Sequence, residues 1–161
     1  MRLAIVALTV LVPAAFAAGR ASSPKPSPQT IEDLKTSMHG EAFAFAKYDL
    51  FAKHARAAGD PKLAELFGST ARTEHGQHFA EEADLAGLVG SDIDNLKDAI
   101  AGERYEVETM YPEFARKAAA AGDQAAADRF NEIRQDEAGH LRAFEAELQR
   151  LEKAAKPTGM Q

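Results

Sequence analysis

The 161-residue chain carries a net charge of −6 and contains neither cysteine nor tryptophan. Without cysteine it cannot form disulfides, thiolate nucleophiles, iron–sulfur clusters or four-cysteine iron sites, so any metal ligands must be oxygen or nitrogen atoms. The acidic balance argues against a nucleic-acid partner, because binding to phosphate requires a basic surface. The abundance of alanine and charged residues indicates a single all-α domain.

The N-terminal segment has the features of a targeting sequence. Arg2 precedes an apolar stretch from Leu3 to Phe16, and Ala15-Phe16-Ala17 matches a small-x-small cleavage pattern. The stretch is shorter than the roughly 20 residues of a membrane-spanning helix. We therefore expect residues 1–17 to be a cleaved signal peptide rather than a retained anchor, and the protein to be periplasmic or secreted.

Four helices are expected after this segment. Residues 18–29 are rich in Ser and Pro and predict an extended tether. Helical periodicity then predicts a helical domain over 30–154 and a flexible tail over 155–161. Glycines and capping residues divide the domain into helices at about 31–58, 61–86, 92–121 and 124–153.

The two halves of the domain resemble each other. The phrase AKHARAAGD at 52–60 is echoed by ARKAAAAGD at 115–123. Four residues of the first half recur 63 positions later: Tyr48, Phe51, Gly59 and Phe67 correspond to Tyr111, Phe114, Gly122 and Phe130. The repeat predicts two antiparallel helical hairpins related by approximate two-fold symmetry.

Each of the four helices places a glutamate in the middle of its apolar face. Glu137 and His140 interrupt the stripe of the last helix, and Glu41, Glu74 and Glu103 hold similar places on the other three. Counted from the hairpin turns, the four glutamates reach about the same level. Because lone buried carboxylates are costly, this pattern indicates a pair of metal ions. Carboxylates with imidazole suit iron or manganese, with zinc by misloading.

At these positions the chain resembles the rubrerythrin family of the ferritin-like superfamily, over about residues 30–150. The motifs are Gly40-Glu41, the GExxE of Gly102 to Glu106, Met110-Tyr111-Pro112 and Glu137-x-x-His140. The resemblance implies a ferritin-like four-helix bundle and two iron ions bound by Glu41, Glu74, Glu103, Glu106, Glu137 and His140. It also implies catalytic roles for Glu103, Glu106, Tyr48 and Tyr111, the tyrosines matching residues that hydrogen-bond ligand carboxylates.

Two features depart from the family pattern. The first-half motif of the family is Glu-x-x-His, but this chain has Gln77 three residues after Glu74, and His78 follows one position later, about 100° around an α-helix. In rubrerythrins that histidine binds one iron when the pair is reduced, in place of the glutamate matching Glu106. Either this switch is absent here, or a local change in helix geometry makes His78 a ligand. The cysteine-free chain also lacks a rubredoxin domain, so electrons must come from a separate donor protein.

Two further expectations concern geometry. Seven residues separate Glu41 from Tyr48, whereas eight separate Glu103 from Tyr111, which predicts a π-bulge near Glu106. The connection at 87–91 spans at most ~18 Å, whereas crossing to the start of the third helix within one bundle needs roughly 39 Å. We therefore expect a homodimer in which two chains exchange hairpins.

The function implied by the resemblance is reduction of hydrogen peroxide at a carboxylate-bridged iron pair, in defence against oxidative stress. One alternative is a ferroxidase or iron-binding protein that uses dioxygen and turns over peroxide poorly. A second alternative is a metal-free helical dimerisation module.

Overall fold

The computed structural model describes residues 25–155. The expected signal peptide, residues 18–24 of the tether and the tail after Ala155 lie outside the described residues. Within 25–155 the chain is helical apart from turns and contains no strand. No helix in this part of the chain has the length and apolar character needed to cross a membrane.

The first hairpin pairs α1 (Pro28–Ala57) with a rod made of α2 (Pro61–Thr73), η1 (Glu74–Phe79) and α3 (Ala80–Ala86). Helix α1 begins two residues before the expected domain boundary, because Ser27 caps it and Pro28 occupies its first turn. Asp60 caps α2 by accepting a 2.9 Å hydrogen bond from the Leu63 amide. The segment η1 is a π-helix, which continues the rod without a break.

The second hairpin pairs a rod of α4 (Asp92–Tyr105), η2 (Glu106–Met110) and α5 (Tyr111–Ala120) with α6 (Gln124–Ala155). The Asp94 amide donates to Ser91 Oγ at 3.2 Å, as the sequence predicts for a capped helix. The π-helical segment η2 confirms the predicted bulge near Glu106. Arg134 Nε donates a 2.8 Å hydrogen bond to the Val107 carbonyl inside this segment.

The internal repeat is visible in the packing next to each turn. Both turns use a glycine in the left-handed region, Gly59 at φ 79° and Gly122 at φ 84°. Ring centroids lie 5.3–6.3 Å apart in the first aromatic cluster and 5.6–6.4 Å apart in the second. The clusters are formed by the predicted equivalents, Tyr48, Phe51 and Phe67 in the first hairpin and Tyr111, Phe114 and Phe130 in the second.

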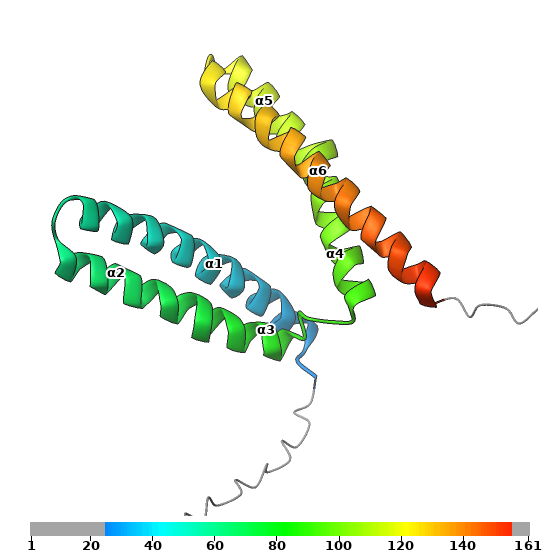
Figure 1. Ribbon diagram of the computed structural model, residues 1–161, viewed down its shortest axis with the longest axis horizontal. Helices are drawn as coiled ribbons and strands as arrows, with labels where there is room; N and C mark the ends of the chain where they lie inside the picture. The colour runs from blue at the N-terminus through cyan, green and yellow to red at the C-terminus, as the bar shows by residue number, and fades with distance from the viewer. Residues whose placement is uncertain (1–24, 156–161) are drawn as a thin grey trace, which may run out of the picture.

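The two hairpins form separate arms joined at the α3–α4 connection (Figure 1). All contacts between elements of the described chain fall within one hairpin or the other. The four-helix bundle expected from the sequence is therefore not assembled within a single chain. Its four helices are present as two independent pairs.

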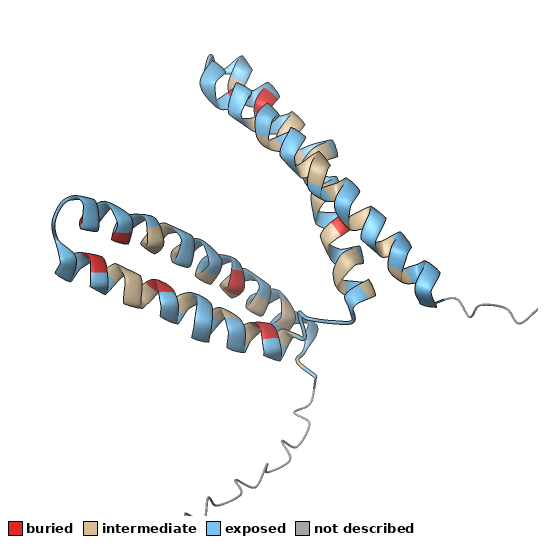
Figure 2. Cartoon of the chain, viewed as in Figure 1, coloured by how far each residue is buried: buried red, intermediate tan, exposed pale blue. Residues whose placement is uncertain are grey.

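Each hairpin has only a thin core. The buried residues follow the seam between paired helices (Figure 2), and nearly all are alanines; they are Met38, Ala52, Ala55, Ala64, Ala71, Ala83, Ile100, Ala115 and Ala127. The larger inward-facing residues Phe45, Phe51 and Phe114 remain 37%, 43% and 39% exposed. Each hairpin thus leaves large apolar residues of its inner face partly exposed.

Candidate metal centre

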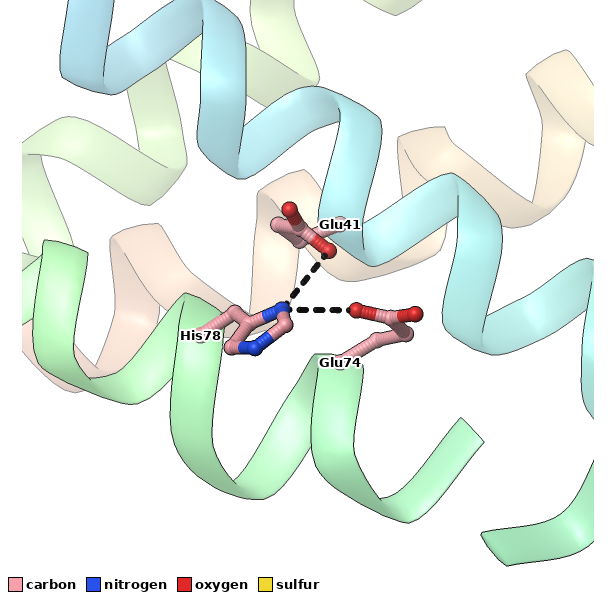
Figure 3. A group of neighbouring side chains, drawn as sticks. All are labelled: Glu41, Glu74 and His78. Carbon is pink, nitrogen blue, oxygen red and sulfur yellow. Dashed lines mark hydrogen bonds and ion pairs between the residues drawn. The ribbon is translucent and has the colours of Figure 1, made fainter. Parts of the chain in front are cut away.

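The first hairpin brings together Glu41 from α1 with Glu74 and His78 from η1 (Figure 3). His78 Nδ1 lies 2.8 Å from Glu74 Oε2 and 3.7 Å from Glu41 Oε2. One potential ligand atom from each residue lies within 4.8 Å of the other two. We call this group the first half-site.

The π-helical turn accounts for the position of His78. In an α-helix a residue four positions after Glu74 overshoots one turn by about 40°, but in a wider π turn each residue rotates by less. The imidazole therefore returns to the face that carries Glu74. Gln77 is exposed and makes no hydrogen bond to either carboxylate in the described chain. The His75 ring instead lies tilted against the Phe45 ring, with centroids 4.9 Å apart.

The second hairpin repeats this arrangement with Glu103 from α4 and Glu137 and His140 from α6. His140 Nδ1 lies 2.6 Å from Glu137 Oε2 and 3.9 Å from Glu103 Oε1. Here the three-residue spacing of an ordinary α-helix is sufficient. This second half-site matches the first residue for residue, although one lies on a π turn and the other on an α-helix.

The carboxylates are better shielded than the imidazoles in both half-sites. The side chains of Glu74 and Glu137 are 15% and 17% exposed, whereas those of His78 and His140 are 49% and 59% exposed. Both histidines thus lie on the open side of their hairpins. A second hairpin placed against that side would cover them.

Crowding of carboxylates perturbs their ionisation. The hydrogen bond with Glu74, followed by burial, raises the pKa of Glu41. Burial, followed by the adjacent Glu137, raises the pKa of Glu103. Burial and then the charge of Glu137 also raise the pKa of Glu106. Each half-site therefore concentrates negative charge, which the adjacent histidine offsets only in part.

The donor set fits a metal ion. Oxygen and nitrogen ligands bind zinc, the best-characterised comparison, at about 2.0–2.2 Å, so two ligands of one ion lie at most about 4.4 Å apart. In each half-site one donor atom from each of the three residues lies within 4.8 Å of the other two, which is close to this span. Glu103 Oε2 is buried and has no hydrogen-bond partner in the described chain. An orphaned carboxylate oxygen beside another acid and an imidazole is satisfied by a cation.

Glu106 and the tyrosines lie beside these groups without completing them. Glu106 is not part of either half-site. Burial and then the charges of Glu106, Glu137 and Glu103 raise the pKa of Tyr111, so its hydroxyl lies in the field of the second half-site. The carboxylate hydrogen bonds implied for Tyr48 and Tyr111 are not formed within the described part of a single chain.

One acidic residue near the first half-site was not predicted from the sequence. Glu82 Oε1 accepts a 2.6 Å hydrogen bond from Ser37 Oγ, whereas its Oε2 is buried and has no partner in the described chain. Its charge contributes to the raised pKa of Glu41. The signal available in the sequence was its position four residues after His78, on the same face of the rod.

Comparison with known proteins places these residues in a family. The profile of the family named Rubrerythrin matches residues 32–148. Nigerythrin from Nitratidesulfovibrio vulgaris is 36% identical over 128 residues, which cover 71% of this chain and 63% of nigerythrin. Rubrerythrin from Porphyromonas gingivalis is 33% identical over 142 residues, covering 77% of this chain and 71% of that protein.

The solved structure of fully reduced, all-ferrous nigerythrin is 30% identical to this chain. The match covers 95% of this chain and 83% of that one, with a TM-score of 0.39. The family match extends over most of the described residues and includes every residue of both half-sites. The chain therefore belongs to the rubrerythrin family.

Proposed function

We propose that this protein is a non-haem di-iron peroxidase that reduces hydrogen peroxide. The observation that carries the proposal is the presence of two matching half-sites, each with two glutamates and one histidine, in a chain of this family. The residues proposed to hold the iron pair are Glu41, Glu74, His78, Glu103, Glu106, Glu137 and His140.

The chemistry divides between the metal and the chain. A bound pair of ferrous ions supplies the two electrons that convert peroxide and two protons into two molecules of water. The glutamates neutralise the ions and hold them together, and the proposed role of Tyr48 and Tyr111 is to fix carboxylate positions by hydrogen bonding. The electrons are proposed to come from a separate donor protein.

Removing one carboxylate of the second half-site tests the proposal. Glu103→Ala and Glu137→Ala are expected to lower peroxidase activity at least about 100-fold, since even partners of metal ligands contribute 10–100-fold. Glu132→Ala is the matched control, because Glu132 also lies on α6 but is exposed and paired with Arg129. Circular dichroism should show unchanged helicity in all three variants. Full turnover in either Glu103→Ala or Glu137→Ala would contradict the assignment.

Stopped-flow oxidation separates a peroxidase from a ferroxidase. The iron-loaded, reduced protein is mixed with peroxide in one experiment and with dioxygen in the other, and iron oxidation is followed optically. We expect the faster reaction with peroxide. A protein that reacts rapidly with dioxygen and slowly with peroxide is instead a ferroxidase.

The proposed assembly is a homodimer with exchanged hairpins. The inward aromatic residues and both histidines are partly exposed in the single chain, and no contact joins its two hairpins within 25–155. Packing the first hairpin of one chain against the second hairpin of another would bury these residues and join two half-sites. The dimer would then contain two complete iron pairs.

The proposed location is outside the cytoplasm, periplasmic or secreted, on the basis of the N-terminal targeting pattern. Iron is the proposed metal, and manganese or zinc would enter the same oxygen and nitrogen ligands by misloading.

A further inference from the structure

The π turn η2 leaves one backbone carbonyl without a partner in its own helix. In this turn the amide of Tyr111 donates to the carbonyl of Glu106, five residues earlier. The next bond of the same type would join the amide of residue 112 to the carbonyl of Val107. Residue 112 is Pro112, which has no N–H. The Val107 carbonyl therefore needs a donor from outside the backbone of its own helix.

Arg134 on α6 supplies this donor. Its Nε lies 2.8 Å from the Val107 carbonyl oxygen, so the hydrogen bond links α6 to η2 across the hairpin. The other side chains that are described within residues 25–155 as donating to a backbone carbonyl reach no further than five positions along the chain. Arg134 reaches a carbonyl 27 positions away, so its bond is not a local helix motif.

The first hairpin shows what occupies this position when no π turn lies opposite. Arg134 follows Phe130 by four residues, as Ala71 follows Phe67 in the other half of the repeat. Ala71 is buried, and α1 opposite it is α-helical throughout. The arginine thus occurs in the half of the repeat that has a π turn on the facing rod, and a small apolar residue occurs in the half that does not.

We infer that Arg134 is a positioning residue, which holds η2 in the π register through the Val107 carbonyl and thereby directs Glu106. Glu106 is the first residue of η2, and its own carbonyl accepts the bond from Tyr111 in this turn. Loosening the turn therefore loosens the backbone that directs the Glu106 side chain. The hold on η2 is a property of the chain alone, whereas its effect on turnover rests on the proposed function.

Two side chains of equal length separate the hydrogen bond of Arg134 from its charge. The amide nitrogen of glutamine lies as many bonds from Cα as the arginine Nε does, so Arg134→Gln keeps a donor and removes the charge. In Arg134→Met a methyl group takes the same place and donates nothing. Hydrogen exchange at the Tyr111 amide of the metal-free protein, followed by NMR, should be roughly tenfold faster in Arg134→Met and unchanged in Arg134→Gln.

Two controls accompany this pair. Arg129→Met should leave exchange at the Tyr111 amide unchanged, because Arg129 also lies on α6 but is exposed and ion-paired within its own helix. Pro112→Ala gives the Val107 carbonyl a backbone donor, so adding Arg134→Met to it should no longer accelerate exchange. Acceleration that persists beside Pro112→Ala, equal acceleration in Arg134→Met and Arg134→Gln, or none in Arg134→Met would each overturn the inference.

A second experiment tests whether Arg134 acts on turnover through Glu106. The rate at which peroxide oxidises the iron-loaded, reduced protein is measured for Arg134→Met, Glu106→Ala and the double variant. Arg134→Met should slow oxidation roughly tenfold by itself, and by less than about twofold when Glu106→Ala is already present. Equal slowing in both backgrounds would show that Arg134 does not act through Glu106. If the wild type does not react with peroxide, the proposed function fails, and hydrogen exchange in the metal-free protein still decides whether Arg134 holds η2.

Discussion

Single carboxylates govern the electrostatics of the metal-free protein. Glu41 lies against Glu74, and Glu103 lies against Glu137, and both have a pKa above the ordinary value of 4.5. A raised pKa means that the folded chain holds the proton more tightly than the unfolded chain does. Ionisation of these two carboxyls therefore lowers the free energy of unfolding of the metal-free protein.

The stability of the metal-free protein should accordingly fall as the pH rises above 4.5 through the raised pKa values of Glu41 and Glu103. The stabilisation from the protonated carboxyls of Glu41 and Glu103 is complete below their pKa in the unfolded chain and lost above their pKa in the folded chain. Hydrogen bonds from Lys117 and Arg150 lower the pKa values of Glu113 and Glu147. These two groups therefore raise the free energy of unfolding as the pH rises, and they do so below pH 4.5. Urea unfolding across this pH range measures the effect.

The matched control is the double variant Glu41→Gln, Glu103→Gln, which cannot release the two protons. The difference in free energy of unfolding between the double variant and the wild type should grow in favour of the variant as the pH rises. Bound metal should remove this difference for the wild type, since the ions require ionised carboxylates. A difference that does not change with pH would contradict the prediction.

At the scale of residues, the apolar stripe was enough to locate Glu41, Glu74, Glu103, Glu137 and His140, which the structure gathers into two groups. A residue that interrupts an apolar face at helical spacing is visible without coordinates. The position of His78 could not be decided in this way, because periodicity assumes a rotation of about 100° per residue and a π turn changes it. The sequence alone does not single out Glu82, because its hydrogen bond with Ser37 depends on how α1 and α3 pack.

At the scale of elements, the caps predicted the helix ends to within a few residues. Both π-helical segments coincide with the same kind of sequence signal, which is a difference of one residue between two otherwise matching halves. The extra residue between Glu103 and Tyr111 predicted η2, and the extra residue between Glu74 and His78 corresponds to η1. In the second case the sequence also allowed the loss of the ligand; the π turn brings His78 beside Glu74, and its role as an iron ligand stays a prediction.

A pair of deletions tests whether η1 absorbs an insertion. Deleting Gly76 shortens the spacing between Glu74 and His78 to three residues, which an α-helix accommodates, so the variant should still bind two ions per chain. Deleting Gly139 between Glu137 and His140 rotates the histidine by about 100° with no π turn to compensate. That variant should bind one ion.

Metal analysis and circular dichroism provide the readout for both deletions. A Gly76 deletion that loses the first-hairpin ion would show that the π turn is itself required for binding.

At the scale of the whole molecule, the short α3–α4 connection is the feature on which the proposed assembly rests. The sequence predicted a link too short to cross a bundle, and in the structure the hairpins stand apart with incomplete cores. A seam of alanines brings two helices close together but buries little apolar surface. The sequence could predict the two hairpins, since their contacts are local, whereas the proposed pairing with a second chain depends on contacts outside the chain that the structure describes.

Mixing two inactive variants tests the exchange of hairpins. One variant carries Glu41→Ala and Glu74→Ala and has an intact second hairpin. The other carries Glu103→Ala and Glu137→Ala and has an intact first hairpin. If hairpins are exchanged, a mixed dimer contains one bundle built from both intact hairpins and one built from both altered hairpins. Neither variant alone can form an intact bundle.

Unfolding the two variants together and refolding them with iron should therefore restore activity and bound iron. Random pairing makes half of the dimers mixed, each with one of its two bundles intact, so recovery should approach about a quarter of the wild-type level. A mixture of Glu103→Ala, Glu137→Ala with His140→Ala should recover nothing, because both variants are altered in the second hairpin. If the first mixture is equally inactive while wild-type protein refolds to full activity, each bundle is formed within one chain and the exchanged dimer is wrong.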